Sequence, residues 1–478
     1  MPKKYDVVIV GAGPAGFMAA RAAGENGLDV ALLEKKGDVT SFNRSCAQTL
    51  VSATEPYMGN LAVLNPRDNR ISLSPDGLSL KYDGPYRNLY AWSFYSPAGH
   101  PVRLGVADEG RKIGEIAKTG TVIDKEVLFQ NILEEVKAVS VDVFPGITVE
   151  KVTPTAEGVK VEGSGQVFEG TYCIAADGVN SGIAEMLGLN EDRYYWCNLN
   201  VISHYMSGVD ADPNTVITSS GYLEDGKVLF FMAPRPYEGE FNVQILSIDP
   251  RVNLKKAMDR FLTTGFTGEW FKNAKKLRSV SAICSCYDPI EEPFKDNVLV
   301  ISDAASTQEI ENIGALLSGW KAGSAISAAV RERNLKLRKM TGISQYVDWW
   351  KETFCESYDH EAYMKNWILT FVMTKAENMS YAFGLVTTPL PASFNPYTAG
   401  KVVGARMATL TPIIAQERPD VWTELVRLRW PLKEVYAEVT DISQPVFDMP
   451  LTPKPRATAK QPREAWVKSL SRFLREKK

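Results

Sequence analysis

Residues 4–36 read KYDVVIVGAGPAGFMAARAAGENGLDVALLEKK, and this stretch decides the fold. An apolar run of strand type over 5–10 leads into the glycine spacing G-x-G-x-x-G over 11–16. The alanine-rich segment that follows predicts a helix from Pro14 to about Asn26, and a second strand is predicted over 30–34. Strand, helix and strand in this order form a β-α-β unit, which is typical of a parallel α/β sheet.

Each glycine of this unit has a physical role. Gly11 permits the tight turn out of the strand, Gly13 lets the backbone approach a pyrophosphate, and Gly16 lets the helix pack closely on the sheet. The helix that starts at Pro14 points unpaired N–H groups and a positive dipole end at the same place. Glu34 ends the second strand, where a carboxylate can accept a hydrogen bond from a ribose. The alternative, a glycine-rich turn without a ligand, is disfavoured because strand, helix and acid all occur in the required order. The unit alone does not distinguish FAD from NAD.

Two later stretches also end strands in an acid. Residues 173–181 read CIAADGVNS, an apolar strand that runs into Asp177. Residues 297–305 read NVLVISDAA, a buried type of strand that runs into Asp303. The following segment over 314–323, GALLSGWKAG, predicts a helix with small residues, which would let it lie close to a bound cofactor.

Composition limits the class of protein. The chain has 478 residues, 45% of them hydrophobic, which is ample for two or three domains with their own cores. A formal net charge of −3 argues against nucleic acid as a partner. Six cysteines are too few for a disulfide framework and favour a reducing cytoplasm, and Cys284-x-Cys286 is interpreted as part of a strand because no second ligand cluster lies nearby. No apolar run is long enough for a transmembrane helix, and the first strand begins too early to leave room for a signal peptide. We therefore expect a cytoplasmic protein without a metal site.

The three motifs together resemble those of the FAD-dependent glutathione-reductase-type superfamily, in its p-hydroxybenzoate-hydroxylase-like branch. The resemblance covers roughly residues 5–330 and rests on GAGPAG with Glu34, on AADGVNS and on ISDAAS. It implies FAD as the cofactor, with the first motif at the pyrophosphate, Asp177 closing that site and Asp303 on the ribityl chain. The residues expected to bind the cofactor are Gly11, Gly13, Pro14, Ala15, Gly16, Glu34, Lys35, Arg44, Cys46, Asp177, Asp303, Gly314 and Ala315.

Within this branch the chain is most similar to geranylgeranyl reductases and FixC-like flavoproteins. The resemblance rests on the segment 95–102, YSPAGHPV, and on the helix after Asp124. Cys46 lies where these reductases carry a cysteine near the flavin, so it is a candidate catalytic residue; the alternative is an ordinary loop cysteine. The resemblance implies a reductase or dehydrogenase that acts by flavin hydride transfer on an apolar unsaturated substrate, of isoprenoid or quinone type. The electron donor would be NAD(P)H, ferredoxin or another flavoprotein, since no second G-x-G-x-x-G is seen.

Several positions depart from the family pattern. Ser302 replaces the usual glycine before the acid of the third motif, and Lys125 replaces an arginine. The signature Y-x-W-x-F-P reads LFFMAP over 229–234, which leaves the substrate class open. One alternative is a flavin monooxygenase of an aromatic substrate, disfavoured because Ala184 stands where S-x-x-R would place its arginine. Another is an electron-transfer flavoprotein that docks a redox partner through its aromatic C-terminal helices.

The predicted fold class is α/β: a Rossmann-type FAD-binding domain, a β-sheet substrate domain and a helical C-terminal region. The expected boundaries are 1–70, 105–185 and 287–332 for the FAD domain, 71–104 and 186–286 for the substrate domain, and 333–478 for the helices. Within the substrate domain, a pocket for an apolar ligand is expected to draw on Phe230, Phe231, Met232, Tyr222 and Tyr237. Because strand residues alternate, only one of Phe230 and Phe231 can face a cavity.

The C-terminal tail is strongly basic. Residues 454–478 carry nine Lys or Arg against two Glu, a net charge of +7. A helix is predicted from Arg463, with Trp466, Leu470 and Phe473 on one face. Such a basic amphipathic helix suits an anionic membrane surface and predicts a peripheral location at the inner face of the membrane. The alternative is that the apolar face docks on the protein's own body.

Overall fold

The computed structural model describes residues 3–51, 55–306, 311–338, 340–357 and 360–441. The first β-α-β unit forms as the sequence predicts, with β1 (Lys4–Val10), α1 (Pro14–Glu25) and β2 (Val30–Glu34). The two strands are parallel, with Val7 opposite Val30 and Val10 opposite Leu33. Both strands are almost wholly buried, as expected for a sheet covered on both faces.

This unit belongs to an eight-stranded sheet that brings the three motifs together. The parallel part has the order β11 (Val141–Pro145), β2, β1, β14 (Gln166–Ala175) and β21 (Val298–Val300). The remaining strands are β12 (Val149–Thr155), β13 (Gly158–Gly163) and β20 (Phe294–Lys295). Ala175 pairs with both Val10 and Val300, so β1, β14 and β21 end at the same edge. The loops that carry Gly11, Asp177 and Asp303 therefore meet there, as ligand-binding loops do in open α/β sheets.

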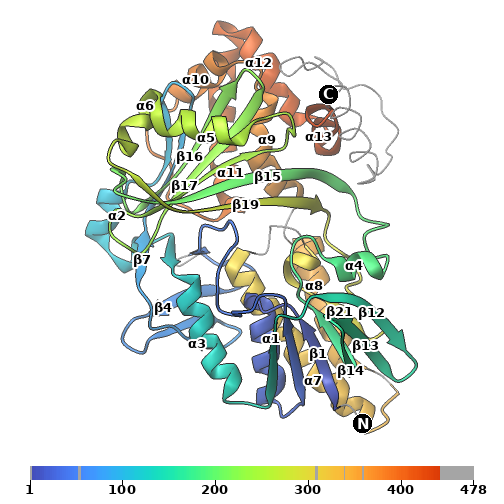
Figure 1. The fold of residues 1–478 in the computed structure, drawn as a ribbon. Coiled ribbons are helices and arrows are strands. Elements are labelled where there is room, and N and C mark those ends of the chain that lie inside the picture. Colours follow the sequence, from blue (N-terminus) through green and yellow to red (C-terminus); the bar gives the residue numbers. More distant parts are fainter. Residues whose placement is uncertain (1–2, 52–54, 307–310, 339, 358–359, 442–478) are drawn as a thin grey trace.

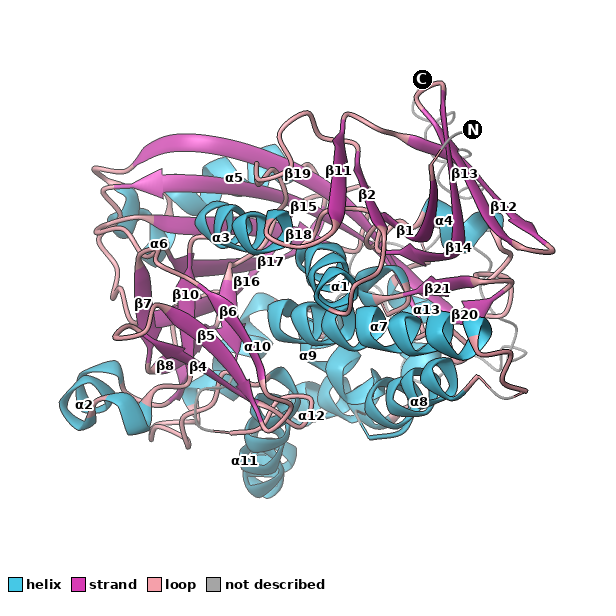
Figure 2. Ribbon diagram, turned by 90° about the horizontal axis from the view of Figure 1, so that it is seen from below, coloured by secondary structure: helices cyan, strands magenta, loops and turns pink. Residues whose placement is uncertain are grey.

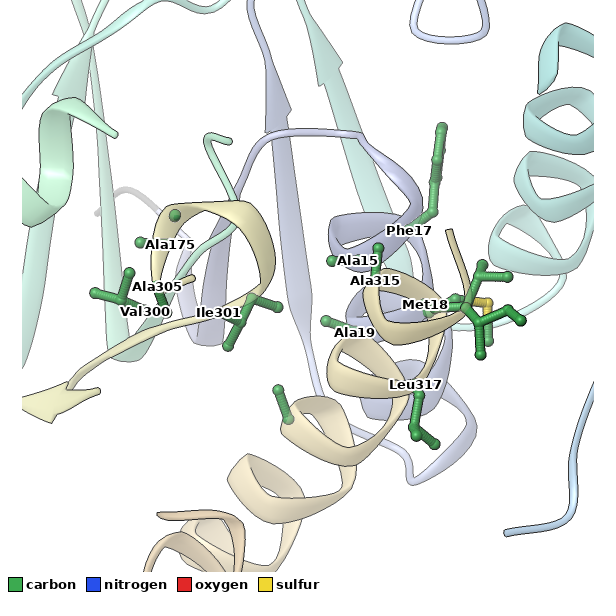
Figure 3. Close-up of a cluster of buried hydrophobic side chains, with 14 of the residues drawn as sticks. Ala15, Phe17, Met18, Ala19, Ala175, Val300, Ile301, Ala305, Ala315 and Leu317 are labelled. Carbon is green, nitrogen blue, oxygen red and sulfur yellow. The ribbon is translucent and has the colours of Figure 1, made fainter. Parts of the chain in front are cut away.

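Helix α7 (Glu311–Asn334) packs along α1, and the small residues of α7 explain how closely. A Cβ at Gly319 would lie 2.1 Å from the backbone oxygen of Ala15, and one at Gly323 would lie 2.4 Å from that of Ala19. Figure 3 shows Ala15 and Ala19 on α1 beside Ala315 on α7. We attributed the small residues to the approach of a cofactor, but Gly319 and Gly323 instead allow α7 to touch the backbone of α1.

A second, seven-stranded sheet lies above the first domain in Figure 1. Its order is β19-β15-β18-β17-β16-β8-β9. Its strands are β8 (Ala91–Tyr95), β9 (Pro101–Leu104), β15 (Tyr195–Ser207), β16 (Thr215–Leu223), β17 (Gly226–Pro234), β18 (Phe241–Ser247) and β19 (Lys275–Tyr287). Helix α5 (Leu254–Thr263) covers the outer face of this sheet. The inner face of the sheet packs into the large hydrophobic core that also includes the eight-stranded sheet. Cys284 and Cys286 lie in β19 as free thiols, in line with the expected strand.

The segment 71–104, which we assigned to the substrate domain, is divided in the structure. Only β8 and β9 join the seven-stranded sheet. Two small sheets hold the rest: β4 (Leu61–Asn65), β5 (Arg70–Ser74) and β6 (Leu78–Lys81) form one, and β3 (Thr49–Val51), β7 (Tyr86–Leu89) and β10 (Gly120–Ile123) form the other. The segment does form strands, as expected of a β-sheet domain, but its sequence did not indicate which strands would pair.

The C-terminal region is helical, as the sequence predicts. Its helices are α8 (Thr341–Trp350), a π-helical turn (Lys351–Ser357), α9 (His360–Val372), α10 (Ala376–Gly384), α11 (Pro396–Glu417), α12 (Pro419–Val426) and α13 (Leu432–Val439). Shorter helices elsewhere are α2 (Ala107–Ile113), α3 (Lys125–Lys137), α4 (Gly182–Met186) and α6 (Gly265–Gly268), with 3-10 turns at Glu115–Ala117, Glu269–Phe271, Ser302–Ala304 and Arg427–Arg429. Figure 2 shows α1, α7 and α8 side by side below the sheets, with α11 projecting from the body. The basic tail lies outside the described residues. Among the helices that are described, none is long and apolar enough to cross a membrane.

Candidate active site

The turn between β1 and α1 needs glycine at two positions because the chain packs on itself. Gly11 has a φ of +102°, and a Cβ there would lie 2.3 Å from the carbonyl oxygen of Ala176. A Cβ on Gly16 would lie 1.7 Å from the carbonyl oxygen of Gly11. These two glycines therefore hold the turn between β1, β14 and α1, as the motif predicts.

Gly13 is different, because its Cβ would meet no atom within 4 Å. Gly13 is the N-cap of α1, and Pro14 follows it in the first turn. No side chain of the described residues caps this helix end. Its N–H groups and positive dipole end thus face open space, where an anion would be stabilised. A pyrophosphate fits this terminus, and a side chain at position 13 would compete with it.

Glu34 is buried at the end of β2, beside this turn. Its carboxylate accepts hydrogen bonds from the backbone N–H of Ala12 at 2.7 Å and from that of Lys36 at 2.9 Å. These hydrogen bonds fix the Glu34 carboxylate at the glycine turn, next to the N-terminus of α1. Lys35 is exposed beside it, and nothing in the structure assigns it a ligand.

The second motif forms a loop that Asp177 stabilises from within. Its buried carboxylate accepts hydrogen bonds from the Ser181 hydroxyl at 2.6 Å and from the Ile183 N–H at 3.2 Å. Burial raises the pKa of Asp177, and the hydrogen bond from Ser181 opposes that rise. Gly178 has a φ of +88°, and a Cβ there would lie 2.8 Å from the guanidinium of Arg44. Glycine at 178 therefore leaves room for Arg44 above the loop.

The third motif and the start of α7 hold two partly buried carboxyls, those of Asp303 and Glu311. Burial raises the pKa of Asp303, while the positive charges of Arg44 and Lys125 lower it. Burial likewise raises the pKa of Glu311 to about 7, and the nearby Asp303 adds to the rise. Ser302, which stands where the flavoproteins that the chain resembles have glycine, has a φ of +58° in the left-handed region that glycine adopts most easily. The structure thus contains the strained position that the family's glycine would relieve.

Cys46 lies where three elements meet. Its Sγ is 3.3 Å from the N–H of Gln48, 3.8 Å from the Nζ of Lys125 at the start of α3, and 4.0 Å from the Nδ2 of Asn312 at the start of α7. Its carbonyl oxygen accepts a hydrogen bond of 2.6 Å from Asn242 on β18. Both domains therefore fix this loop cysteine, and three N–H donors surround its sulfur.

The five residues expected in the substrate pocket do not lie together. Phe230 is fully buried on the outer face of the sheet, where its ring stacks on Phe261 of α5 with centroids 4.3 Å apart. Met232 belongs to the same outer cluster, while Phe231 packs against the inner core. The alternation of strand residues thus removes Phe230 and Met232 from the inner face and leaves Phe231 there.

The two expected tyrosines face different neighbours. Tyr222 donates its hydroxyl to the carbonyl of Thr370 on α9 at 3.3 Å, so it fixes the helical region to the sheet. Tyr237 donates to the Oδ2 of Asp124 at 2.8 Å and lies at the edge of the region around Cys46.

A cavity of about 200 Å³ opens between α3, the loop after β2 and the ends of the substrate strands. It is lined by Phe42, Gln48, Asp124, Glu126, Tyr205, Arg235, Leu277 and Arg278. Most of these side chains are polar or charged, which no sequence motif indicated. Strand register brings two of them together, since Tyr205 on β15 pairs directly with Arg278 on β19, and tertiary packing adds those from the loop after β2 and the start of α3.

Comparison with known proteins agrees with this geometry. The sequence profile of the pyridine nucleotide-disulphide oxidoreductase family matches residues 5–90. The digeranylgeranylglycerophospholipid reductase of Methanosarcina acetivorans is 24% identical over 393 residues, which are 78% of this chain and 86% of that protein. The protein of the same name from Methanocaldococcus jannaschii is 24% identical over 364 residues, or 74% of this chain and 83% of that one.

The fold agrees as well. A geranylgeranyl bacteriochlorophyll reductase-like protein from Thermoplasma acidophilum superposes with a TM-score of 0.63 at 19% identity, covering 89% of this chain and 99% of that one. The p-nitrophenol 4-monooxygenase of Pseudomonas putida superposes with a TM-score of 0.56 at 12% identity, covering 86% and 98%. The predicted α/β fold, the resemblance to geranylgeranyl reductases and the expectation of an FAD-dependent oxidoreductase are confirmed.

Proposed function

We propose that this protein is an FAD-dependent reductase of an apolar, unsaturated lipid of isoprenoid type. The single observation that carries the cofactor assignment is the open helix terminus at Gly13, beside the buried Glu34 and at the sheet edge where the strand before Asp303 also ends. The substrate class is supported by the relatives named digeranylgeranylglycerophospholipid reductase, which the chain matches over most of their length.

Different residues of the chain would bind different parts of the cofactor. The N-terminus of α1 and Gly13 would bind the pyrophosphate, Glu34 the ribose and Asp303 the ribityl hydroxyls. Arg44, placed over Gly178, adds a positive charge near the phosphates. When bound, reduced FAD supplies a hydride equivalent to the substrate.

The substrate side is formed by the inner face of the seven-stranded sheet. Phe231, Leu229 and Leu246 on this face are apolar and pack into the inner core. Cys46 lies between this face and the two helix termini, and we assign it a role in tuning the reaction rather than in covalent attack. An apolar surface next to a small cluster of polar groups is the usual composition of a lipid or cofactor pocket.

The electron donor and the membrane contact are further parts of the proposal. The donor is NAD(P)H, ferredoxin or another flavoprotein, acting on a cytoplasmic enzyme. The basic segment 454–478, with its net charge of +7, would bring this enzyme to an anionic bilayer that contains the substrate. Removal of residues 460–478 should abolish co-sedimentation with anionic liposomes; equal sedimentation of the full and shortened chains would end the membrane proposal.

Anaerobic reduction of the purified flavin tests the reaction type. NADH, NADPH and reduced ferredoxin are offered in turn, and the reduced protein is then exposed to air. Slow reoxidation without a hydroperoxide absorbance supports the reductase. Rapid substrate-stimulated consumption of NAD(P)H and oxygen would identify a monooxygenase instead.

A further inference from the structure

Tyr205 is a buried tyrosine held between two arginines. Its side chain is 1% exposed, and its ring lies on the inner face of the substrate sheet. The guanidinium carbon of Arg278 is 4.4 Å from the ring centroid, and that of Arg235 is 5.0 Å from it. Arg235 is mostly buried at this position, with 16% of its side chain exposed, whereas the Arg278 side chain stays 38% exposed. At least one of the two cations over the phenol ring therefore loses much of its hydration, which packing alone does not require.

The surroundings of Tyr205 leave its proton available. Its hydroxyl oxygen accepts a hydrogen bond of 3.3 Å from the Nε2 of Gln48, and both guanidinium groups can only donate. The same residue lines the 200 Å³ cavity. A hydroxyl that accepts from the protein on one side can donate to a ligand on the other.

The charged groups around the cavity are already arranged in pairs. Arg235 binds Asp124 at 3.3 Å and Glu240 at 2.6 Å, and Arg278 binds Glu126 at 3.2 Å. These carboxylates orient the two arginines over the ring through their ion pairs with the guanidinium groups. Lys125 is another cation of this region, and its Nζ lies 3.8 Å from the Sγ of Cys46.

Burial raises the pKa of Tyr205, and the nearby Cys46 adds to the rise, whereas Arg278 and Arg235 lower it. The phenol is therefore protonated before the reaction, as an acid catalyst must be. The two cations then stabilise the tyrosinate that remains after proton transfer.

We propose that Tyr205 is the proton donor of this reductase, which rests on the function proposed above. Saturation of a double bond adds a hydride, taken from the reduced flavin, to one carbon. The electron pair of the π bond then forms a C–H bond at the other carbon with the proton of Tyr205, whose O–H bond breaks. Arg235 and Arg278 are positioning residues that hold the resulting tyrosinate until solvent in the cavity returns a proton.

The experiment compares Tyr205→Phe with Tyr346→Phe in the FAD-loaded protein. Tyr346, on α8, is also buried, and its hydroxyl has no hydrogen-bond partner among the described residues, so it controls for loss of a buried phenol. Each protein is reduced with dithionite without oxygen and mixed with a digeranylgeranylglycerol phospholipid in detergent. Loss of a general acid should slow flavin reoxidation by about 10²–10⁴-fold in Tyr205→Phe only, with FAD content unchanged. Equal rates in Tyr205→Phe and wild type would overturn the proposal.

A second measurement does not depend on turnover. NMR of protein labelled at the tyrosine Cζ follows ionisation of Tyr205, identified by its absence in Tyr205→Phe. Replacing Arg278 by Leu should move this titration to higher pH, because a stabilising cation is lost. An unchanged titration would refute the role of the arginines and with it the donor assignment. If the wild-type flavin is not reoxidised by the lipid, the proposed function fails, and the titration still decides whether Tyr205 is poised as an acid.

Discussion

Replacing Gly13 by Ala separates cofactor binding from folding. The backbone at Gly13 has φ −82° and ψ −177°, an extended conformation that alanine adopts without strain. A Cβ there meets no atom within 4 Å, so the folded apoprotein accommodates the methyl group. Loss of glycine's freedom in the unfolded chain adds about 0.4–1 kcal/mol of stability. Alanine is a poorer N-cap than glycine by a similar amount, so the net change in apoprotein stability should stay within about 1 kcal/mol.

The same methyl group would occupy the space that a pyrophosphate needs at the start of α1. Displacement of the phosphates by even a fraction of the methyl radius lengthens their hydrogen bonds to the backbone N–H groups. A hydrogen bond to a charged group contributes about 1.5–3 kcal/mol. Loss of one such bond raises the Kd for FAD by about tenfold to more than a hundredfold. Gly13→Glu, which adds a negative charge, should abolish binding.

Gly16→Ala is the matched control, because its Cβ would lie 1.7 Å from the carbonyl oxygen of Gly11. We expect it to destabilise the apoprotein by about 3 kcal/mol, because a backbone atom cannot move aside easily. Urea unfolding of the apoproteins and fluorescence titration with FAD measure the two effects. The reasoning fails if Gly13→Ala binds FAD as tightly as wild type, or if it loses as much apoprotein stability as Gly16→Ala.

Four further changes test other parts of the site. Ser302→Gly should stabilise the protein by about 1–2 kcal/mol in urea unfolding, because it relieves a positive φ; a loss of stability would show that the serine is not strained. Burial raises the pKa of Glu311 from its ordinary value of 4.5 to about 7, so its contribution to stability is present below pH 4.5 and is lost as the pH rises towards 7. Glu311→Gln should therefore make the flavin-free protein more stable above pH 7, by about 3 kcal/mol at most, and an unchanged pH profile would contradict this. Asp303→Ala should weaken FAD binding tenfold or more, through loss of charge-assisted hydrogen bonds of about 1.5–3 kcal/mol each, and an unchanged Kd would remove Asp303 from the site. Cys46→Ser should alter turnover or the flavin potential while FAD content stays at the wild-type level; wild-type values of both would return Cys46 to an ordinary loop residue.

The first motif shows what local sequence can predict. Gly11, Gly13 and Gly16 each have a local physical reason, and the structure places Gly11 and Gly16 in contacts that exclude a side chain. The convergence of Asp177 and Asp303 was also predictable, because the carboxyl ends of parallel strands meet at one edge of a sheet. These features depend on residues close in sequence or on a rule about sheet topology.

The residues expected in the substrate pocket show what sequence patterns could not predict, namely which face of the sheet each side chain would lie on. The alternation over 229–234 indicated that Phe230 and Phe231 face opposite sides, but not which side contacts α5 and which contacts the cofactor domain. Helix α5, which covers Phe230, follows later in the chain. Tertiary packing therefore decides which face of the sheet α5 covers. For the same reason the sequence did not indicate that Gly319 and Gly323 of α7 contact the backbone of α1.

The cluster around Tyr205 had no signal in the sequence at all. Tyr205 and Arg278 face each other on the neighbouring strands β15 and β19, although β16, β17 and β18 lie between these strands in the sequence. Gln48 comes from the loop before β3. Antiparallel register joins Tyr205 to Arg278, and packing between the domains adds Gln48. Register is set by turns and by core packing across the whole sheet. A charged residue at a strand end is common, so neither arginine could be distinguished from a solvated side chain beforehand.

The most direct test of the central claim is a single anaerobic turnover of the FAD-loaded protein. The flavin is reduced with dithionite, a digeranylgeranylglycerol phospholipid is added, and flavin absorbance and lipid mass are followed together. The account predicts that the flavin absorbance of the oxidised form returns while the lipid gains one pair of hydrogens for each flavin reoxidised. A protein that holds no FAD, or a reduced flavin that stays reduced while the lipid mass is unchanged, would contradict it.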